Sequence, residues 1–83
     1  MSEIRILGVM VQEKSQASLA VQATLTKYGC SIKTRLGLNN LDKPGCENCG
    51  LIILELTGDP SECIRLENEL WALPGVRVQK MVF

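Results

Sequence analysis

The chain has 83 residues, and its nine acidic and nine basic side chains give a formal net charge of zero at neutral pH. Without a basic excess to neutralise phosphates, direct binding of DNA or RNA is not expected. No apolar stretch is long enough to span a membrane, and the first residues do not begin a signal peptide. We therefore expect one small cytoplasmic domain over residues 1–83.

The first third of the chain predicts a strand followed by a helix. Ile4–Val11 is apolar on both faces except at Arg5, which is typical of a central strand. Ser15 is the expected cap of the helix and Gly29 its expected left-handed terminator. Between them, one apolar stripe follows helical spacing and consists of Ala17, Val21, Leu25 and Tyr28.

Two further strands are predicted on either side of a long loop. Cys30–Leu38 alternates regularly, as a half-exposed edge strand does. Its apolar side would carry Cys30, Ile32, Thr34, Leu36 and Leu38, and its polar side Ser31, Lys33, Arg35 and Gly37. Asn39–Cys49 is rich in turn-forming residues and is expected to be a hairpin loop. Gly50–Thr57 then predicts a central strand with Ile52, Leu54 and Leu56 toward the core and Leu51 and Ile53 on the other face.

The last part of the chain predicts a second helix and a fourth strand. Asp59 is the expected cap, Pro60 stands at the first helical position, and Glu62 completes a capping box. The buried stripe would be Cys63, Leu66, Leu70 and Leu73, and Pro74-Gly75 would end the helix before a strand over Val76–Phe83.

The predicted order β-α-β-β-α-β corresponds to an α+β, ferredoxin-like fold: a four-stranded antiparallel sheet with two helices on one face. With right-handed crossovers, the first and third strands are central. The outward face of the sheet would then carry Leu51 and Ile53, together with some of Leu7, Val9 and Val11. Such an uncovered apolar face predicts a homodimer or a higher homo-oligomer.

Several segments resemble ACT-type regulatory domains. These are Ile6–Leu38 with its Tyr28-Gly29-Cys30-Ser31-Ile32 run, and Leu70-Trp71-Ala72-Leu73-Pro74-Gly75-Val76. The segments Ser31–Gly37 and Leu73–Val78 are most similar to the iron-only hydrogenase system regulators, which are small stand-alone ACT-like proteins. The resemblance implies a non-catalytic, oligomeric cytoplasmic regulator that acts on a small molecule or a hydrogenase-related protein.

Candidate ligand-binding residues lie in the first connection and on the second strand. They are Gln12, Glu13, Lys14 and Arg35. In ACT domains that bind amino acids, the first connection usually carries an Asp-x-Pro-Gly-like turn, whereas here it reads Gln12-Glu13-Lys14-Ser15. The resemblance therefore does not extend to amino-acid binding at that turn. Arg35 and Lys33, expected on one polar face, could instead hold an anion.

The four cysteines are expected to be reduced, because no export signal is present. Cys30 and Cys63 stand at apolar positions and are expected to be buried small hydrophobes. Cys46 and Cys49 form one C-x-x-C pair in the loop, and they are either exposed thiols without a task or half of a metal site. A tetrahedral zinc or iron–sulfur site needs four ligands, so a second protomer would have to supply the other pair.

No catalytic constellation is visible in the sequence. The chain has no histidine, and no paired carboxylates or phosphate-binding loop can be recognised. Two hypotheses remain: a regulatory module that binds a small ligand, and a metal or iron–sulfur sensor or carrier that uses Cys46 and Cys49 from more than one protomer.

Overall fold

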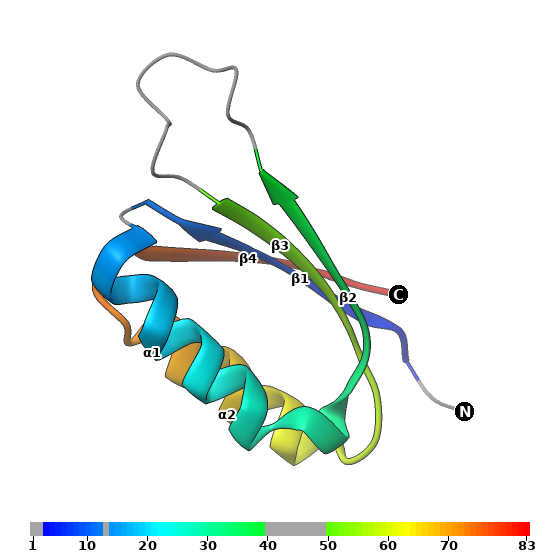
Figure 1. Ribbon diagram of the computed structural model, residues 1–83. Coiled ribbons are helices and arrows are strands. Elements are labelled where there is room, and N and C mark those ends of the chain that lie inside the picture. Colours follow the sequence, from blue (N-terminus) through cyan, green and yellow to red (C-terminus); the bar gives the residue numbers. More distant parts are fainter. Residues whose placement is uncertain (1–2, 13, 40–49) are drawn as a thin grey trace.

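In the computed structural model, which describes residues 3–12, 14–39 and 50–83, both helices cover one face of a four-stranded antiparallel sheet (Figure 1). The strand order is β2-β3-β1-β4. The elements follow one another as β1 (Arg5–Val11), α1 (Lys14–Lys27), a 3₁₀ turn (Gly29–Ser31), β2 (Ile32–Asn39), β3 (Gly50–Leu56), α2 (Pro60–Trp71) and β4 (Val76–Val82). This is the predicted ferredoxin-like α+β arrangement, with β1 and β3 central. No helix in the described ranges is long and apolar enough to cross a membrane.

The core lies between the sheet and the two helices. On β3, Leu54 and Leu56 are buried and Ile52 packs against the core, as alternation predicted. On β1 the prediction was wrong, since Leu7, Val9 and Val11 all belong to the core rather than to the outward face. Leu7 is paired with Leu54 and Val9 with Ile52, and directly paired residues share a face. The outward positions of β1 are those between them.

Helix α1 has the predicted buried stripe but different ends. Ala17, Val21, Leu25 and Tyr28 are all buried. The helix begins at Lys14, so Ser15 lies inside it and is not the cap. Gly29 is not left-handed either, because the chain continues into the right-handed 3₁₀ turn, where the Ser31 N–H donates to the Tyr28 carbonyl at 2.9 Å.

Strand β2 is an edge strand, as predicted, but a bulge shifts its alternation. Ile32 pairs with Leu56 and Thr34 with Glu55, so Lys33 is an extra residue between two consecutive pairs. Ile32 therefore packs against the core, whereas Leu36 pairs with Ile53 on the outward face. The expectation that Ile32 and Leu36 share one face was wrong, since an inserted residue reverses the phase of a strand.

Helix α2 begins as its sequence predicts. The Asp59 carboxylate accepts hydrogen bonds from the Ser61 backbone N–H at 3.0 Å and from the Ser61 hydroxyl at 2.9 Å. Pro60 is the first helical residue. Cys63, Leu66 and Leu70 are buried, as predicted, together with Glu67. The chain then turns into β4 through Gly75, whose φ of 76° requires glycine.

Candidate functional site

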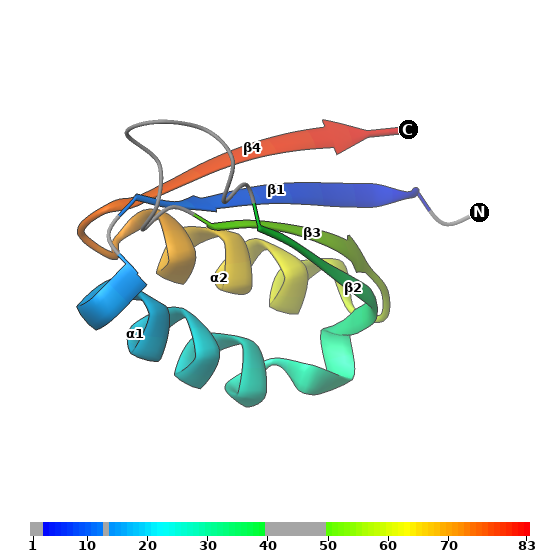
Figure 2. The ribbon, with the colours of Figure 1, turned by 45° about the horizontal axis from the view of Figure 1, so that its top comes forward.

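In the part of the chain that the structure describes, one face of the sheet carries no helix, and we call it the open sheet face (Figure 2). Its apolar side chains come from all four strands and are Ile6, Met10, Leu36, Leu38, Leu51, Ile53 and Met81. Leu36 is 53% exposed and Met81 54% exposed. Cross-strand pairing places Met10 beside Leu51 and Ile53 beside Leu36, so these side chains form one continuous surface.

A small pocket opens on the opposite side of the sheet, between α1 and the edge strand β2, and we call it the Arg35 pocket. Its volume is about 160 Å³, and it is lined by Val11, Ser18, Gln22, Arg35, Gly37, Leu38, Gly50, Leu51 and Ile52. Gly37 contributes to the hollow, because no atom of the described residues lies within 4 Å of the position its Cβ would take. At the rim, Arg35 Nη2 donates to Gln22 Oε1 at 2.7 Å.

Of the predicted ligand residues that the structure describes, Arg35 alone lines this pocket. Gln12 directly follows Val11, one of the lining residues, and its backbone N–H donates to the Gly75 carbonyl at 2.8 Å. Lys14 begins α1 two residues further on. Glu13, Cys46 and Cys49 lie outside the described residues. Gln22 and Ser18 were missed, since a sequence cannot show which helical residues face an edge strand.

Arg35 and Lys33 do not share a face, contrary to prediction. The bulge at Lys33 separates them: Arg35 pairs with Leu54 and contacts α1, whereas Lys33 Nζ lies 3.8 Å from Glu55 Oε2. Glu55 also accepts a hydrogen bond from the Thr34 hydroxyl at 3.3 Å. A single anion cannot therefore use both cations as two neighbours on one polar strand face.

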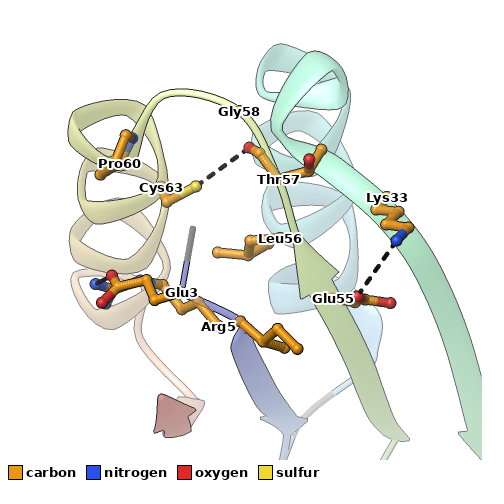
Figure 3. A pocket seen from close by; sticks show the side chains of 10 residues that line it. Glu3, Arg5, Lys33, Glu55, Leu56, Thr57, Gly58, Pro60 and Cys63 are labelled. Atoms are coloured by element: carbon orange, nitrogen blue, oxygen red, sulfur yellow. Dashed lines mark hydrogen bonds and ion pairs between the residues drawn. The ribbon is translucent and has the colours of Figure 1, made fainter. Parts of the chain in front are cut away.

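A larger recess, of about 450 Å³, lies at the other end of the sheet, where β3 leads into α2 (Figure 3). Arg5 Nη2 lies 2.7 Å from Glu3 Oε1 on one wall, and the Lys33–Glu55 pair lines the other. The charges of these four side chains cancel in pairs. The recess thus has no net charge that would select a cation or an anion.

The thiol in this recess is not activated. Cys63 Sγ donates to the Thr57 carbonyl at 3.4 Å, and burial raises the pKa of the thiol (Figure 3). A raised pKa keeps the Cys63 thiol protonated at neutral pH, whereas only the thiolate is a good nucleophile. Cys30, expected to be buried, is instead exposed in the 3₁₀ turn.

A polar cluster joins the end of α1 to α2. Lys27 Nζ lies 3.2 Å from both carboxylate oxygens of Glu69, and the Tyr28 hydroxyl donates to the same carboxylate. The hydrogen bond from Tyr28, followed by that from Lys27, lowers the pKa of Glu69. The hydrogen bond to Glu69 in turn raises the pKa of Tyr28 and the pKa of Lys27. The cluster is held by its own charges and leaves no group poised for acid–base catalysis.

A second network crosses from α2 to the sheet. Glu67 Oε1 lies 3.5 Å from Arg5 Nη1, and Glu67 Oε2 lies 3.3 Å from Lys80 Nζ. The Glu67 side chain is only 11% exposed, so its charge needs these partners. Within residues 3–12, 14–39 and 50–83, no three cysteine or carboxylate side chains lie close enough together to hold a metal ion.

Comparison with known proteins shows that solved structures share this fold. No protein-family model matches the sequence, and no curated protein matches it. The solved structure of an uncharacterized protein from Thermotoga maritima is similar, with 25% sequence identity, a TM-score of 0.84, and 99% of each chain covered.

Two more distant structures share the fold alone. A PII-like nitrogen regulatory protein from Thiomonas intermedia K12, solved with ADP, AMP and bicarbonate, has 16% identity and a TM-score of 0.60 over 99% of this chain and 91% of its own. A formyltetrahydrofolate deformylase from Pseudomonas putida KT2440 has 12% identity and a TM-score of 0.59 over 94% of this chain. The similarity spans only 28% of the deformylase, so the domain fold recurs inside a larger enzyme.

Proposed function

We propose that this chain is a non-catalytic, ACT-like regulatory domain that assembles with copies of itself and binds a small ligand. The observation that carries the proposal is the open sheet face, which leaves a continuous apolar surface uncovered in a small protein. The Arg35 pocket supports the ligand half of the proposal. The fold itself is compatible with regulation, since a PII-like regulatory protein shares it, although function is decided by the site.

Self-association follows from the energetics of the open sheet face. Each large aliphatic side chain contributes about 1.5–3 kcal/mol when it is fully removed from water. Leu36, Ile53 and Leu51 lie side by side with Met10 on this face. Contiguous exposed apolar patches of this kind mark interaction sites, and an 83-residue chain has a modest core of its own.

The ligand class follows from the Arg35 pocket. Arg35 presents a guanidinium group at a rim that also carries the Gln22 amide, above a hollow lined by Ile52 and Val11. A guanidinium binds planar anions through paired hydrogen bonds. We propose a small anionic metabolite as the ligand, with Gln12, Glu13 and Lys14 of the first connection as further contacts.

The biological setting rests on the resemblance to iron-only hydrogenase system regulators. It supports a single cytoplasmic ACT-like domain over residues 1–83 that acts on a hydrogenase-related partner. The segments that carry the resemblance, Ser31–Gly37 and Leu73–Val78, include most of β2 and the start of β4.

Sedimentation equilibrium tests the assembly. Leu51→Glu places a charge on the open sheet face and should reduce the molar mass at micromolar concentration by at least a factor of two. Leu19→Glu is the matched control, since Leu19 is 74% exposed on α1, away from this face. A wild-type protein that is monomeric throughout, or a Leu51→Glu variant with unchanged mass, would contradict the proposal.

Isothermal titration with a panel of carboxylate and phosphate metabolites tests the ligand. Arg35→Ala should weaken binding by about tenfold to a hundredfold, because a hydrogen bond to a charged group contributes about 1.5–3 kcal/mol. Lys33→Ala removes a neighbouring cation on the other side of β2 and should leave the affinity unchanged. Equal losses in both variants, or no binding by the wild type, would exclude the Arg35 pocket as an anion site.

A further inference from the structure

We propose that β4 is a second self-association edge: two copies pair their β4 strands antiparallel about a two-fold axis at Gln79, and their α2 helices meet beneath the joined sheet. This pairing does not depend on the open sheet face. It rests on the backbone pattern of β4, on the register that its residues permit, and on an exposed apolar flank along α2.

The hydrogen-bond pattern of β1 and β4 determines which backbone groups remain open. Ile4 and Phe83 exchange both backbone hydrogen bonds, at 3.1 and 2.8 Å. In an antiparallel ladder such pairs recur at every second residue, so Met81, Gln79 and Arg77 also direct their N–H and C=O groups toward β1. The alternate residues Val78, Lys80 and Val82 therefore direct theirs away from the sheet, at the outer edge of β4 (Figure 2).

This edge lacks two of the devices that usually prevent strand pairing, a bulge and a proline. Edge strands are commonly protected by bulges, prolines or charged side chains, and of these β4 carries only charges, at Arg77 and Lys80. The other edge strand, β2, has such a bulge at Lys33. Strand β4 pairs with β1 without a register shift from Val76 to Val82, and its Lys80 is held under the sheet by Glu67. The contrast selects β4 as the edge available for a partner.

The sequence of β4 favours one register with itself. A two-fold axis at Gln79 pairs Val76 with the partner's Val82 and Val78 with the partner's Lys80, so that the whole strand is used. Moving the axis to Lys80 would place two like charges directly opposite each other, which is destabilising. The full-length register is thus the one without a charge conflict.

Helix α2 offers a matching apolar flank. Ile64 is 45% exposed and Trp71 53% exposed, and both lie on the helix that contacts β4 through the Glu67–Lys80 pair. They are seven residues apart and so occupy the same helical face, on either side of Glu67 in sequence. A two-fold axis beside the middle of β4 brings Ile64 of one copy to the partner's Trp71, and the reverse. Tryptophan in such a contact is a common anchor of interfaces.

Together with the open sheet face, the β4 edge gives each copy two different two-fold interfaces. Two such interfaces close into an assembly of four copies with dihedral symmetry. This last step rests on the proposed function, whereas the pairing of β4 does not. The two interfaces can therefore be tested separately.

Lys80→Pro tests the edge directly. Proline removes an outward N–H that β1 does not use, so the sheet within one copy should remain intact. Lys80→Ala is the matched control, because it also loses the contact with Glu67 but keeps the N–H. We expect Lys80→Pro to halve the molar mass of the assembly and Lys80→Ala to leave it unchanged, with circular dichroism confirming that both are folded. An unchanged molar mass for Lys80→Pro would overturn the proposal, and it is the result expected if the β4 edge pairs with an extended segment of a different protein. A halved molar mass for both variants would overturn it as well.

A disulfide provides the second test, which holds even if the proline variant fails to fold. In the proposed register the two Gln79 residues form a non-hydrogen-bonded pair, whose Cα atoms lie about 4.5 Å apart, within the range a disulfide spans. Gln79→Cys, with Cys30, Cys46 and Cys49 replaced by serine, should form a covalent dimer on mild oxidation. Arg77→Cys in the same background should not, because Arg77 lies opposite the partner's Met81.

The same disulfide separates the two interfaces. If Gln79→Cys still forms the covalent dimer when Leu51→Glu is added, the β4 edge pairs independently of the open sheet face. Loss of the dimer in that background, equal oxidation of Gln79→Cys and Arg77→Cys, or no dimer with Gln79→Cys would overturn the β4 pairing. A monomeric Leu51→Glu protein without the disulfide tests the proposed function alone.

Discussion

At the scale of single residues, the carboxylate of Glu69 links two side chains at the end of α1. It accepts hydrogen bonds from Tyr28 and Lys27, and Lys27 Nζ also lies 5.3 Å from the centre of the Tyr28 ring. These contacts join the end of α1 to α2. The cluster therefore couples helix packing to protonation.

The direction of the pH effect follows from the shifted pKa values. The pKa of Glu69 is lowered in the folded state. The stabilisation that the Glu69 carboxylate gives the folded state is therefore complete above about pH 4.3, and it is lost as the pH falls through the lowered pKa. The pKa of Tyr28 is raised, so the stabilisation that the Tyr28 hydroxyl gives the folded state is complete below about pH 10 and is lost as the pH rises through the raised pKa. The cluster thus favours the folded state between these two limits.

We predict that Tyr28→Phe moves the pKa of Glu69 back toward its ordinary value. The Tyr28 hydrogen bond is the largest cause of the lowered pKa, so Lys27→Met should have a smaller effect. Thermal unfolding of Tyr28→Phe should occur at a lower temperature than that of the wild type at pH 7, and the difference should shrink in acid. Carboxyl resonances followed by NMR across the acid range measure both variants; a larger shift in Lys27→Met would contradict this order.

At the scale of elements, β3 is one of the two interior strands of the sheet. It pairs with both β1 and β2, and Leu54 at its centre is fully buried. We predict that Leu54→Ala lowers the free energy of unfolding by about 2–5 kcal/mol. The amides of Ile52–Leu56 should be among the slowest to exchange with solvent in the wild type.

Leu19→Ala is the matched control for Leu54→Ala. It removes the same atoms from a position that is 74% exposed on α1 and lies away from the open sheet face, so the expected loss is smaller. Urea unfolding at a fixed protein concentration compares the two variants. Equal losses, or rapid exchange across Ile52–Leu56, would mean that β3 is not the interior strand of the protein in solution.

The elements also show what the sequence can predict. Alternation on β3 gives the correct faces because the charged Glu55 marks one side of the strand as outward. Leu54 and Leu56 mark the other side as facing the core. On β1 both faces are apolar, so alternation alone cannot tell Leu7 from Ile6; the pairing with β3 decides. The bulge at Lys33 has no signature in the regular alternation of β2, and it separates Lys33 from Arg35. For that reason the candidate site was predicted only in part.

At the scale of the whole molecule, Cys63 is buried in the core, Cys30 is exposed in the 3₁₀ turn, and Cys46 and Cys49 lie outside the described residues. We predict that Cys46→Ser with Cys49→Ser leaves the thermal unfolding temperature unchanged, because the described core is complete without them. Cys63→Ser should instead cost about 1–3 kcal/mol, since it buries a more polar group. Metal analysis and an absorbance spectrum after anaerobic purification decide whether the pair also holds zinc or iron. A double variant that fails to fold would show that these thiols are structural.

The backbone hydrogen bonds between Ile4 and Phe83 have a consequence for engineering the chain. They hold Ile4 and Phe83 side by side at one end of the sheet, so that a short peptide linker could join the chain there without displacing β1 or β4. Joined in this way, the polypeptide becomes a ring, and its unfolded form loses a part of the conformational entropy that opposes folding. New ends could then be cut at an exposed connection elsewhere, and the order in which the strands are synthesised would change while their arrangement in the sheet stayed the same.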